Sequence, residues 1–249
     1  MNRVGVFFAL AFAITWLLDV PLVLAHRAGT PPGDLAMLGA GLGAWGPALA
    51  MLIVTRARPG LRWRTNPLWV VLGLALTPGL HLVATLIEVA LGGTPAQWFY
   101  PPVQPEHVAA LVMFSLGEEL GWRGYAHGKL LESRGPVVGA LILGFMWAAW
   151  HLAMWLADGL PSASVISFGF VELMAGSVLI AWLFEESGRS MWVAFALHAG
   201  GHLDNVNRAP PEELRLRALR LLVYVAAAAV AGWALKQQRR AAPASEFAA

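Results

Sequence analysis

Two adjacent carboxylates, Glu118 and Glu119, follow an apolar stretch and precede an arginine, Arg123. Ionisable residues inside an apolar segment are costly and by default mark a functional site. On a helix, Glu119 and Arg123 are four residues apart and share a face, so we expect them to pair. Glu118 lies about 100° further around the helix and lacks that partner. The two carboxylates therefore suit different roles, Glu118 as a general base and Glu119 as a structural anion. The alternative is a charged helix end whose arginine extends to water.

Three histidines in other apolar segments are further candidates for chemistry. His151 lies one helical turn after Trp147, and His198 and His202 are four residues apart, on one face of a helix. A lone histidine in an apolar helix is more often a hydrogen-bonded packing residue than a catalyst. If these side chains converge with the glutamates, they supply a second proton acceptor or donor and oxyanion donors in a water-poor cavity.

The composition places these residues in a membrane protein. The chain has 249 residues, of which 58% are hydrophobic and 13% charged, whereas a soluble domain carries about 25% charged residues. The net charge is +2, and the basic residues lie between apolar runs. This pattern fits membrane topology better than a nucleic-acid surface, so we expect no nucleic-acid partner. There are no cysteines, which excludes disulfides and cysteine metal sites.

We predict an all-α polytopic membrane protein with about eight transmembrane helices around an intramembrane polar cavity, because a backbone in lipid must satisfy its own hydrogen bonds. The predicted segments are residues 4–25, 35–55, 67–91, 108–131, 136–157, 162–184, 190–204 and 218–235. The seventh is short, so it is either a half-span or a helix buried among the others. We expect one domain over residues 1–236 and a polar, disordered tail at 237–249.

The basic residues predict the topology. The loop after the second segment contains four arginines and no acid: Arg56, Arg58, Arg62 and Arg64. This loop is predicted to be cytoplasmic, which places both termini in the cytoplasm and suggests a plasma-membrane protein in contact with lipid. Four arginines before the last segment favour the opposite orientation: Arg208, Arg215, Arg217 and Arg220.

Four other polar residues lie inside predicted segments: Asp19, His81, Glu88 and Glu172. His81 and Glu88 are seven residues apart and lie on nearly the same helical face, so they would form a pair or line the cavity. We interpret all four as structural or cavity-lining residues.

The chain resembles the CPBP intramembrane proteases, which include type II CAAX prenyl proteases and bacteriocin-processing relatives. The first family motif is Glu-Glu-x-x-x-Arg, which Glu118, Glu119 and Arg123 match in full. The second is an aromatic residue followed by x-x-x-His. Trp147 and His151 match it, with tryptophan where phenylalanine is usual.

The third family motif is His-x-x-x-Asn, and only His198 matches it, because His202 stands where asparagine is usual. The resemblance implies a glutamate-dependent peptidase with a site inside the membrane, acting on a membrane-associated peptide or protein. By the same resemblance, Glu118 activates water with the help of His151, His198 and the residue at 202 stabilise the oxyanion, and Arg123 orients the acidic pair. A neutral histidine donates one hydrogen bond, as an asparagine amide can.

Two other interpretations remain open. His151, His198, His202 and Glu118 are a plausible zinc set by ligand type, which would make the same protease metal-dependent. The His-Glu-x-x-His signature of zinc proteases is absent, however, and our main prediction involves no cofactor. Alternatively, the same buried charges belong to a non-catalytic transporter or peptide-binding protein. A transporter of this kind is expected to show an internal repeat, and we find none.

Overall fold

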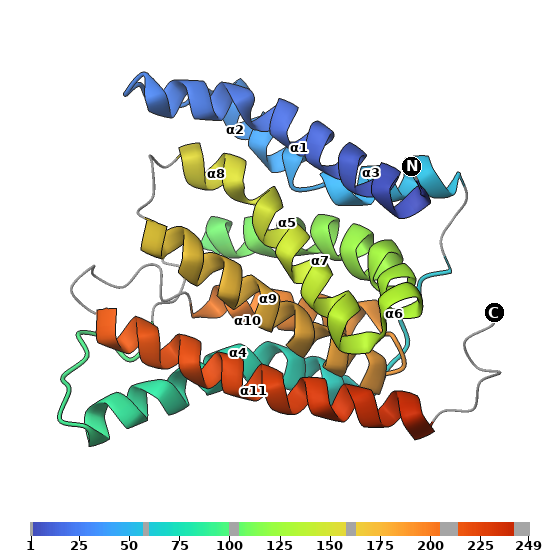
Figure 1. Cartoon of the computed structure of the whole chain (residues 1–249). Helices are drawn as coiled ribbons and strands as arrows, with labels where there is room; N and C mark the ends of the chain where they lie inside the picture. Colours follow the sequence, from blue (N-terminus) through green and yellow to red (C-terminus); the bar gives the residue numbers. More distant parts are fainter. Residues whose placement is uncertain (1, 57–59, 100–104, 158–162, 205–213, 242–249) are drawn as a thin grey trace. The chain divides into compact units, whose positions relative to one another are not determined.

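The computed structural model describes residues 2–56, 60–99, 105–157, 163–204 and 214–241, and these are almost entirely helical (Figure 1). The helices are α1 (Arg3–Arg27), α2 (Asp34–Gly43), α3 (Gly46–Thr55), α4 (Pro67–Ala90), α5 (Pro105–Gly121), η1 (Trp122–His127), α6 (Gly128–Arg134), α7 (Pro136–Trp150), α8 (Leu152–Ala157), α9 (Ala163–Glu186), α10 (Met191–Leu203) and α11 (Leu214–Ala241). The prediction of an all-α protein is confirmed for the described residues. The predicted polar tail begins inside α11, and its residues 242–249 lie outside the described residues.

Several helices are suited to cross a membrane. Within the described residues, five are long and apolar enough: Arg3–Arg27, Pro67–Ala90, Pro136–Trp155, Ile166–Glu186 and Leu214–Gln238. A sixth span results if α2 and α3 are counted together. At 13 residues, α10 is shorter than the roughly 20 residues that a span needs, and most of its side chains are buried. These features show a multi-pass membrane protein, while the count of about eight spans and the polar cavity stay predictions.

The predicted segment 35–55 is two helices rather than one, with a 50° bend between α2 and α3. Pro47 explains the break, because proline has no N–H to donate to the carbonyl of residue i−4, which here is Gly43. The Thr15 hydroxyl of α1 donates to that carbonyl instead, at 2.7 Å. The prediction of one continuous helix over residues 35–55 is therefore wrong, although α2 and α3 together pass as one bent span.

The helices form two compact units, Met1–Leu61 with Met113–Met174 and Arg62–Val112 with Ala175–Ala249. In the first unit, α1 packs against α2, α3 and α8, and α7 packs against α6 and η1. In the second unit, α4 packs against both α10 and α11. The single domain expected over residues 1–236 stays a prediction.

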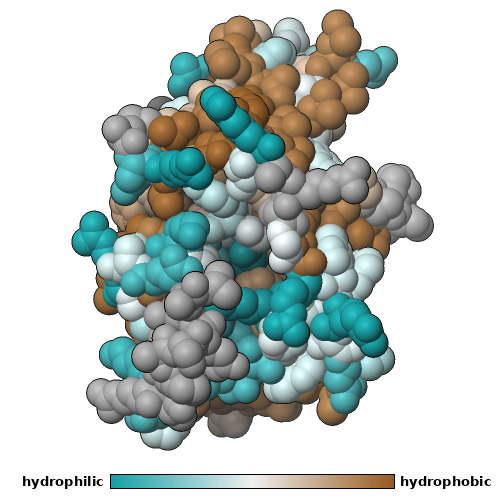
Figure 2. All heavy atoms as spheres, turned by 90° about the vertical axis from the view of Figure 1, so that its right-hand side faces the viewer, coloured by the Kyte–Doolittle hydropathy of each residue, from teal (hydrophilic) through white to brown (hydrophobic). Residues whose placement is uncertain are grey.

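Hydrophobic side chains are exposed along the outer faces of these helices. Leu17 of α1 is 72% exposed, Leu68 of α4 is 60% exposed and Val230 of α11 is 67% exposed. Figure 2 shows one face of the molecule, on which brown hydrophobic patches reach the surface beside hydrophilic groups. Exposed apolar surface of this kind is expected where helices face lipid rather than water.

Two glycines allow α4 and α10 to approach closely. A Cβ atom at Gly73 of α4 would lie 3.0 Å from the Ala196 Cβ atom, and one at Gly200 of α10 would lie 2.6 Å from the Leu74 carbonyl oxygen. Small residues at helix interfaces let backbones come this near in membrane proteins. The close contact fixes the position of the helix that carries His198 and His202.

We expect Gly200→Ala to destabilise the protein by about 1–3 kcal/mol, because the new methyl group meets backbone atoms that cannot move aside. Gly201→Ala is the matched control, since no atom lies within 4 Å of a Cβ atom built there. Thermal unfolding in detergent micelles measures both variants. Equal stability of the two variants would contradict the close packing of α10 against α4.

Candidate functional site

Glycines also position the helix that carries the two adjacent carboxylates. Gly117 and Gly121 are four residues apart on α5, and both lie against the junction of α2 and α3. A Cβ atom at Gly117 would be 2.9 Å from the Ala44 carbonyl oxygen, and one at Gly121 would overlap Pro47. This glycine face seats α5 in the first unit, and Glu118 and Glu119 lie beside it, 5% and 0% exposed.

A π-helical turn, η1, follows directly after these carboxylates. Such turns are rare, and when present they are frequently found at functional sites. Trp122, the first residue of η1, is fully buried, and its ring contacts Phe7 and Phe8 of α1 and Trp150 of α7. The aromatic packing holds the irregular turn in place between two neighbouring helices.

Glu119 and Arg123 form the predicted ion pair. The Arg123 Nη1 atom donates to Glu119 Oε1 at 2.9 Å, and both side chains are fully buried. The predicted i, i+4 pairing is therefore confirmed. His127, which is 1% exposed, also interacts electrostatically with Glu119. Glu119 is therefore the carboxylate whose charge is compensated by a guanidinium.

We expect Glu119→Gln to destabilise the protein by about 3–5 kcal/mol, because the buried Arg123 guanidinium then lacks the negative charge that compensates it. Glu132→Gln is the control, because the Lys129–Glu132 pair is about half exposed, with side chains 54% and 47% accessible. That control should change stability by less than about 1 kcal/mol. Chemical denaturation in micelles measures the free energy of unfolding of both variants. A similar decrease in Glu119→Gln and Glu132→Gln would contradict a structural role for Glu119.

Trp147 of α7 connects the predicted site residues of the first unit. Its indole Nε1–H donates to Glu118 Oε2 at 2.6 Å, and the Arg123 guanidinium carbon lies 5.0 Å from the centroid of its ring, within the range of a cation–π interaction. Its backbone carbonyl contacts the imidazole of His151. One tryptophan thus contacts the candidate base, the candidate orienting arginine and the candidate histidine.

His151 lies at the junction between α7 and α8, inside the continuous candidate span Pro136–Trp155. Its backbone N–H is shared between the Trp147 and Ala148 carbonyls, at 3.3 and 3.1 Å, while its Nδ1 atom lies 2.9 Å from the Trp147 carbonyl oxygen. A side chain that competes for a helix carbonyl distorts the local hydrogen bonding. Because a carbonyl only accepts, Nδ1 carries a proton, and Nε2 is the basic nitrogen of the neutral imidazole.

Aromatic rings surround His151. The Trp155 ring stacks on the imidazole with centroids 5.9 Å apart, and the Trp150 ring contacts it edge to face at 4.8 Å. Trp155 in turn packs against Phe170 of α9. Three tryptophans, Trp147, Trp150 and Trp155, thus contact the His151 imidazole.

His198 and His202 both lie on α10, in the second unit, and the centroids of their rings are 5.1 Å apart. The predicted common face is confirmed, and His198 is 7% exposed. The structure thus groups Glu118, Glu119, Arg123 and His151 in one unit and His198 and His202 in the other. That the two groups act at one site stays a prediction.

The zinc alternative needs three or four ligands close together. Within either unit, no three histidine, aspartate or glutamate side chains among the described residues lie close enough together to hold a metal ion. The four ligands suggested by the sequence are divided between the units, as Glu118 with His151 and His198 with His202. The cofactor-free site stays our main prediction and zinc dependence its alternative, and experiment decides between them.

His81 and Glu88 contact other residues instead of the pair suggested by their spacing. The His81 Nδ1 atom lies 3.4 Å from Asp204 Oδ2, and Glu88 Oε2 lies 2.9 Å from Arg215 Nε. Arg220, which sequence reasoning treated only as a topology signal, is 1% exposed and donates to Asp204. Asp204 and Arg220 carry opposite charges inside predicted apolar segments, and this signal could have identified them.

Comparisons with known proteins agree with the motifs. Residues 104–204 match the family model described as Type II CAAX prenyl endopeptidase Rce1-like, and this range contains every predicted site residue. A curated relative, CAAX prenyl protease 2 of Methanococcus maripaludis, is 23% identical over 168 residues, which cover 62% of this chain and 62% of that protein. The match therefore spans somewhat less than two thirds of the length of that relative.

Proposed function

We propose that this chain is an intramembrane endopeptidase of the CPBP family, which hydrolyses a peptide bond of a membrane-associated peptide or protein; its similarity to the Rce1-like family model and to a CAAX prenyl protease supports this. The observation that carries this proposal is the arrangement around Trp147, whose N–H binds the Glu118 carboxylate and whose carbonyl binds His151. A buried carboxylate and a partly buried imidazole, both suited to proton transfer, thus share one neighbour.

Glu118 is the proposed general base. The Trp147 N–H donates a hydrogen bond to one of its oxygens, Oε2, and this hydrogen bond orients the carboxylate. Glu118 takes a proton from water, the resulting hydroxide attacks the carbonyl carbon of the peptide, and the proton then passes to the leaving nitrogen. The C–N bond breaks, so that one peptide and one water give one carboxylic acid and one amine. General base catalysis of this kind contributes about 100- to 10,000-fold in rate.

His151 is proposed to assist in activating the water. Its Nδ1–H is engaged by the Trp147 carbonyl, and this tautomer presents Nε2 as a hydrogen-bond acceptor for a water proton. The stacked Trp155 ring and the edge-to-face Trp150 ring restrict the motion of the imidazole. A histidine held in this way acts together with a carboxylate without rotating during the reaction.

Glu119 and Arg123 are proposed to position the base rather than to react. Their buried pair fixes the helical turn that carries Glu118. The guanidinium also lies over the Trp147 ring, so it constrains the indole that binds Glu118. The arrangement supports the role that the family motif implies for the arginine.

His198 and His202 are proposed to donate hydrogen bonds to the oxyanion of the tetrahedral intermediate. Support comes from the family motif, which His198 matches, and from their common face on α10. His202 stands where asparagine is usual, and a neutral imidazole N–H can replace the amide donor. Donors of this kind act where charge develops in the transition state.

We propose that the protein lies in the plasma membrane. Both termini would be cytoplasmic, because the arginine-rich loop from Arg56 to Arg64 is predicted to be on the cytoplasmic side. Its substrate would be held by the same membrane. Lipid is therefore a partner of the protein, and nucleic acid is not.

Cleavage of a membrane-anchored peptide library tests the proposed function. We expect the purified protein in liposomes to produce defined peptide fragments, identified by mass spectrometry, and a chelator to leave their yield unchanged. Loss of cleavage with the chelator and its recovery with zinc would assign His151, His198, His202 and Glu118 as metal ligands. Absence of cleavage across the library would favour the peptide-binding or transport function and would contradict the proposal.

A further inference from the structure

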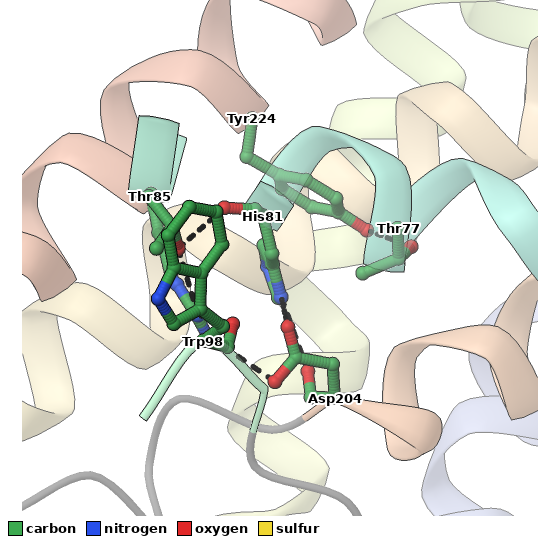
Figure 3. Close-up of polar contacts among 7 residues, drawn as sticks. Thr77, His81, Thr85, Trp98, Asp204 and Tyr224 are labelled. Atoms are coloured by element: carbon green, nitrogen blue, oxygen red, sulfur yellow. Dashed lines mark hydrogen bonds and ion pairs between the residues drawn. The ribbon is translucent and has the colours of Figure 1, made fainter. Parts of the chain in front are cut away.

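The second unit contains a cluster of buried polar side chains. On α4, Thr77, His81 and Thr85 are spaced four residues apart and share a face, and Tyr224 of α11 faces them (Figure 3). The Tyr224 hydroxyl lies 3.4 Å from Thr77 Oγ1, and its ring centroid lies 6.1 Å from that of His81. Polar groups buried among apolar helices are costly to keep unless they have a function or are fully hydrogen-bonded.

Asp204 connects this cluster to the end of α10, where it is the C-cap residue. The His81 Nδ1 atom contacts Asp204 twice, lying 3.1 Å from its backbone carbonyl oxygen and 3.4 Å from Oδ2 (Figure 3). The Arg220 Nη1 atom donates to Asp204 Oδ1 at 3.3 Å. Both the carbonyl and the carboxylate of the C-cap residue are therefore held by side chains of other helices.

Arg220 connects further elements to the same point. Its Nη2 atom donates to Thr85 Oγ1 of α4 at 3.1 Å and to the Trp98 carbonyl in the segment after α4 at 3.0 Å. Arg220 and Asp204 are 1% and 0% exposed. A guanidinium suits this role because its planar donors reach several acceptors at fixed angles, which an ammonium group does not.

The placement of Asp204 is not explained by the stability of α10 alone. A carboxylate at a helix C-terminus is unfavourable, because that end carries partial negative charge. The Arg220 guanidinium and the His81 N–H offset this charge. Since α10 has 13 residues, close to the length at which an isolated helix is only marginally stable, it depends on its contacts for a fixed position.

We propose that Asp204, Arg220 and His81 are positioning residues, which fix the C-terminal half of α10 and thereby the imidazoles of His198 and His202. This inference rests on the proposed function, because it assigns a role to α10 in the same reaction. The start of α10 is held separately, by the Met191 N–H donating to the Arg62 carbonyl at 2.8 Å. The helix that carries the proposed oxyanion donors is thus fixed at both ends by different contacts.

The test compares Asp204→Asn, and the charge-free double variant Asp204→Asn with Arg220→Gln, with the wild type. In the single variant the buried Arg220 guanidinium loses its carboxylate partner, whereas the double variant removes both charges. The double variant therefore keeps the test valid if the single variant does not fold. Glu185→Gln with Arg189→Gln is the matched control. This pair precedes α10 in the chain, with Arg189 Nε 3.1 Å from Glu185 Oε1 and 39% of the arginine side chain exposed.

Hydrogen–deuterium exchange in liposomes gives a result that does not require activity. We expect both Asp204 variants to exchange about tenfold faster or more in residues 197–203, while the first turn of α10 and the control pair keep the exchange rates of the wild type. Unchanged exchange in residues 197–203 would overturn the proposal.

Steady-state cleavage of a library substrate gives the second result. We expect the Asp204 variants to lower kcat by about 10- to 100-fold, with KM within about twofold, because only oxyanion stabilisation is lost. Faster exchange with unchanged kcat would overturn the positioning role while the proposed function stands. Absence of cleavage by the wild type would overturn the proposed function, and with it any role of these residues in catalysis.

Discussion

Glu118→Gln is expected to slow peptide cleavage by about 100- to 10,000-fold, the range by which a positioned general base contributes to rate. Glutamine has nearly the same shape as glutamate, and its amide oxygen can still accept the Trp147 N–H that now binds Glu118 Oε2. Its amide does not take a proton from water, however. The loss should therefore fall on kcat, with substrate affinity retained.

The stability of Glu118→Gln separates this prediction from general damage to the fold. Unlike Glu119, which is paired with the buried Arg123, Glu118 accepts a hydrogen bond from a neutral donor, the Trp147 indole. Thermal unfolding of Glu118→Gln should therefore resemble that of the wild type, whereas Glu119→Gln unfolds more easily. Cleavage by Glu118→Gln at the rate of the wild type would remove Glu118 from the mechanism.

His198→Ala is expected to slow cleavage by about 100- to 1,000-fold, as the removal of one oxyanion donor typically does. The imidazole lies on a helix that is packed closely against α4, so alanine should leave the helix in place. The measurement is the cleavage rate of the same library substrate under saturating conditions, because the lost interaction forms only in the transition state.

Substitutions at His202 provide the control for this prediction. His202→Asn restores the residue that is usual in the family and keeps a side-chain donor, so we expect its rate within about tenfold of the wild type. His202→Ala removes the donor and should be slowed about as much as His198→Ala. If His198→Ala cleaves as fast as the wild type, the histidines of α10 are not oxyanion donors.

The sequence was sufficient to predict the helices and the local pairs. The apolar segments place helices at nearly the observed positions, because the bilayer leaves few alternatives for a long hydrophobic chain. Spacing alone predicted the Glu119–Arg123 pair and the common face of His198 and His202, since contacts within one helix follow from its period.

The features that the sequence did not predict depend on contacts between helices. The bend after Gly43 requires Thr15 of another helix to bind the freed carbonyl, and the spacing of His81 and Glu88 did not indicate that their partners are Asp204 and Arg215. The hydrogen bond from Trp147 to Glu118 likewise joins two helices. Such contacts depend on which faces of different helices pack together, and the periodicity of the sequence within one helix does not determine this.

The central claim is that water, activated by Glu118, cleaves the peptide bond. The most direct measurement is cleavage of one identified substrate in ¹⁸O-labelled water by the wild type and by Glu118→Gln, with mass spectrometry of the N-terminal fragment. We predict that the fragment from the wild type carries ¹⁸O in its new carboxylate and that Glu118→Gln produces this labelled fragment only at the background rate. Labelled fragment at equal rates from both proteins would contradict the account.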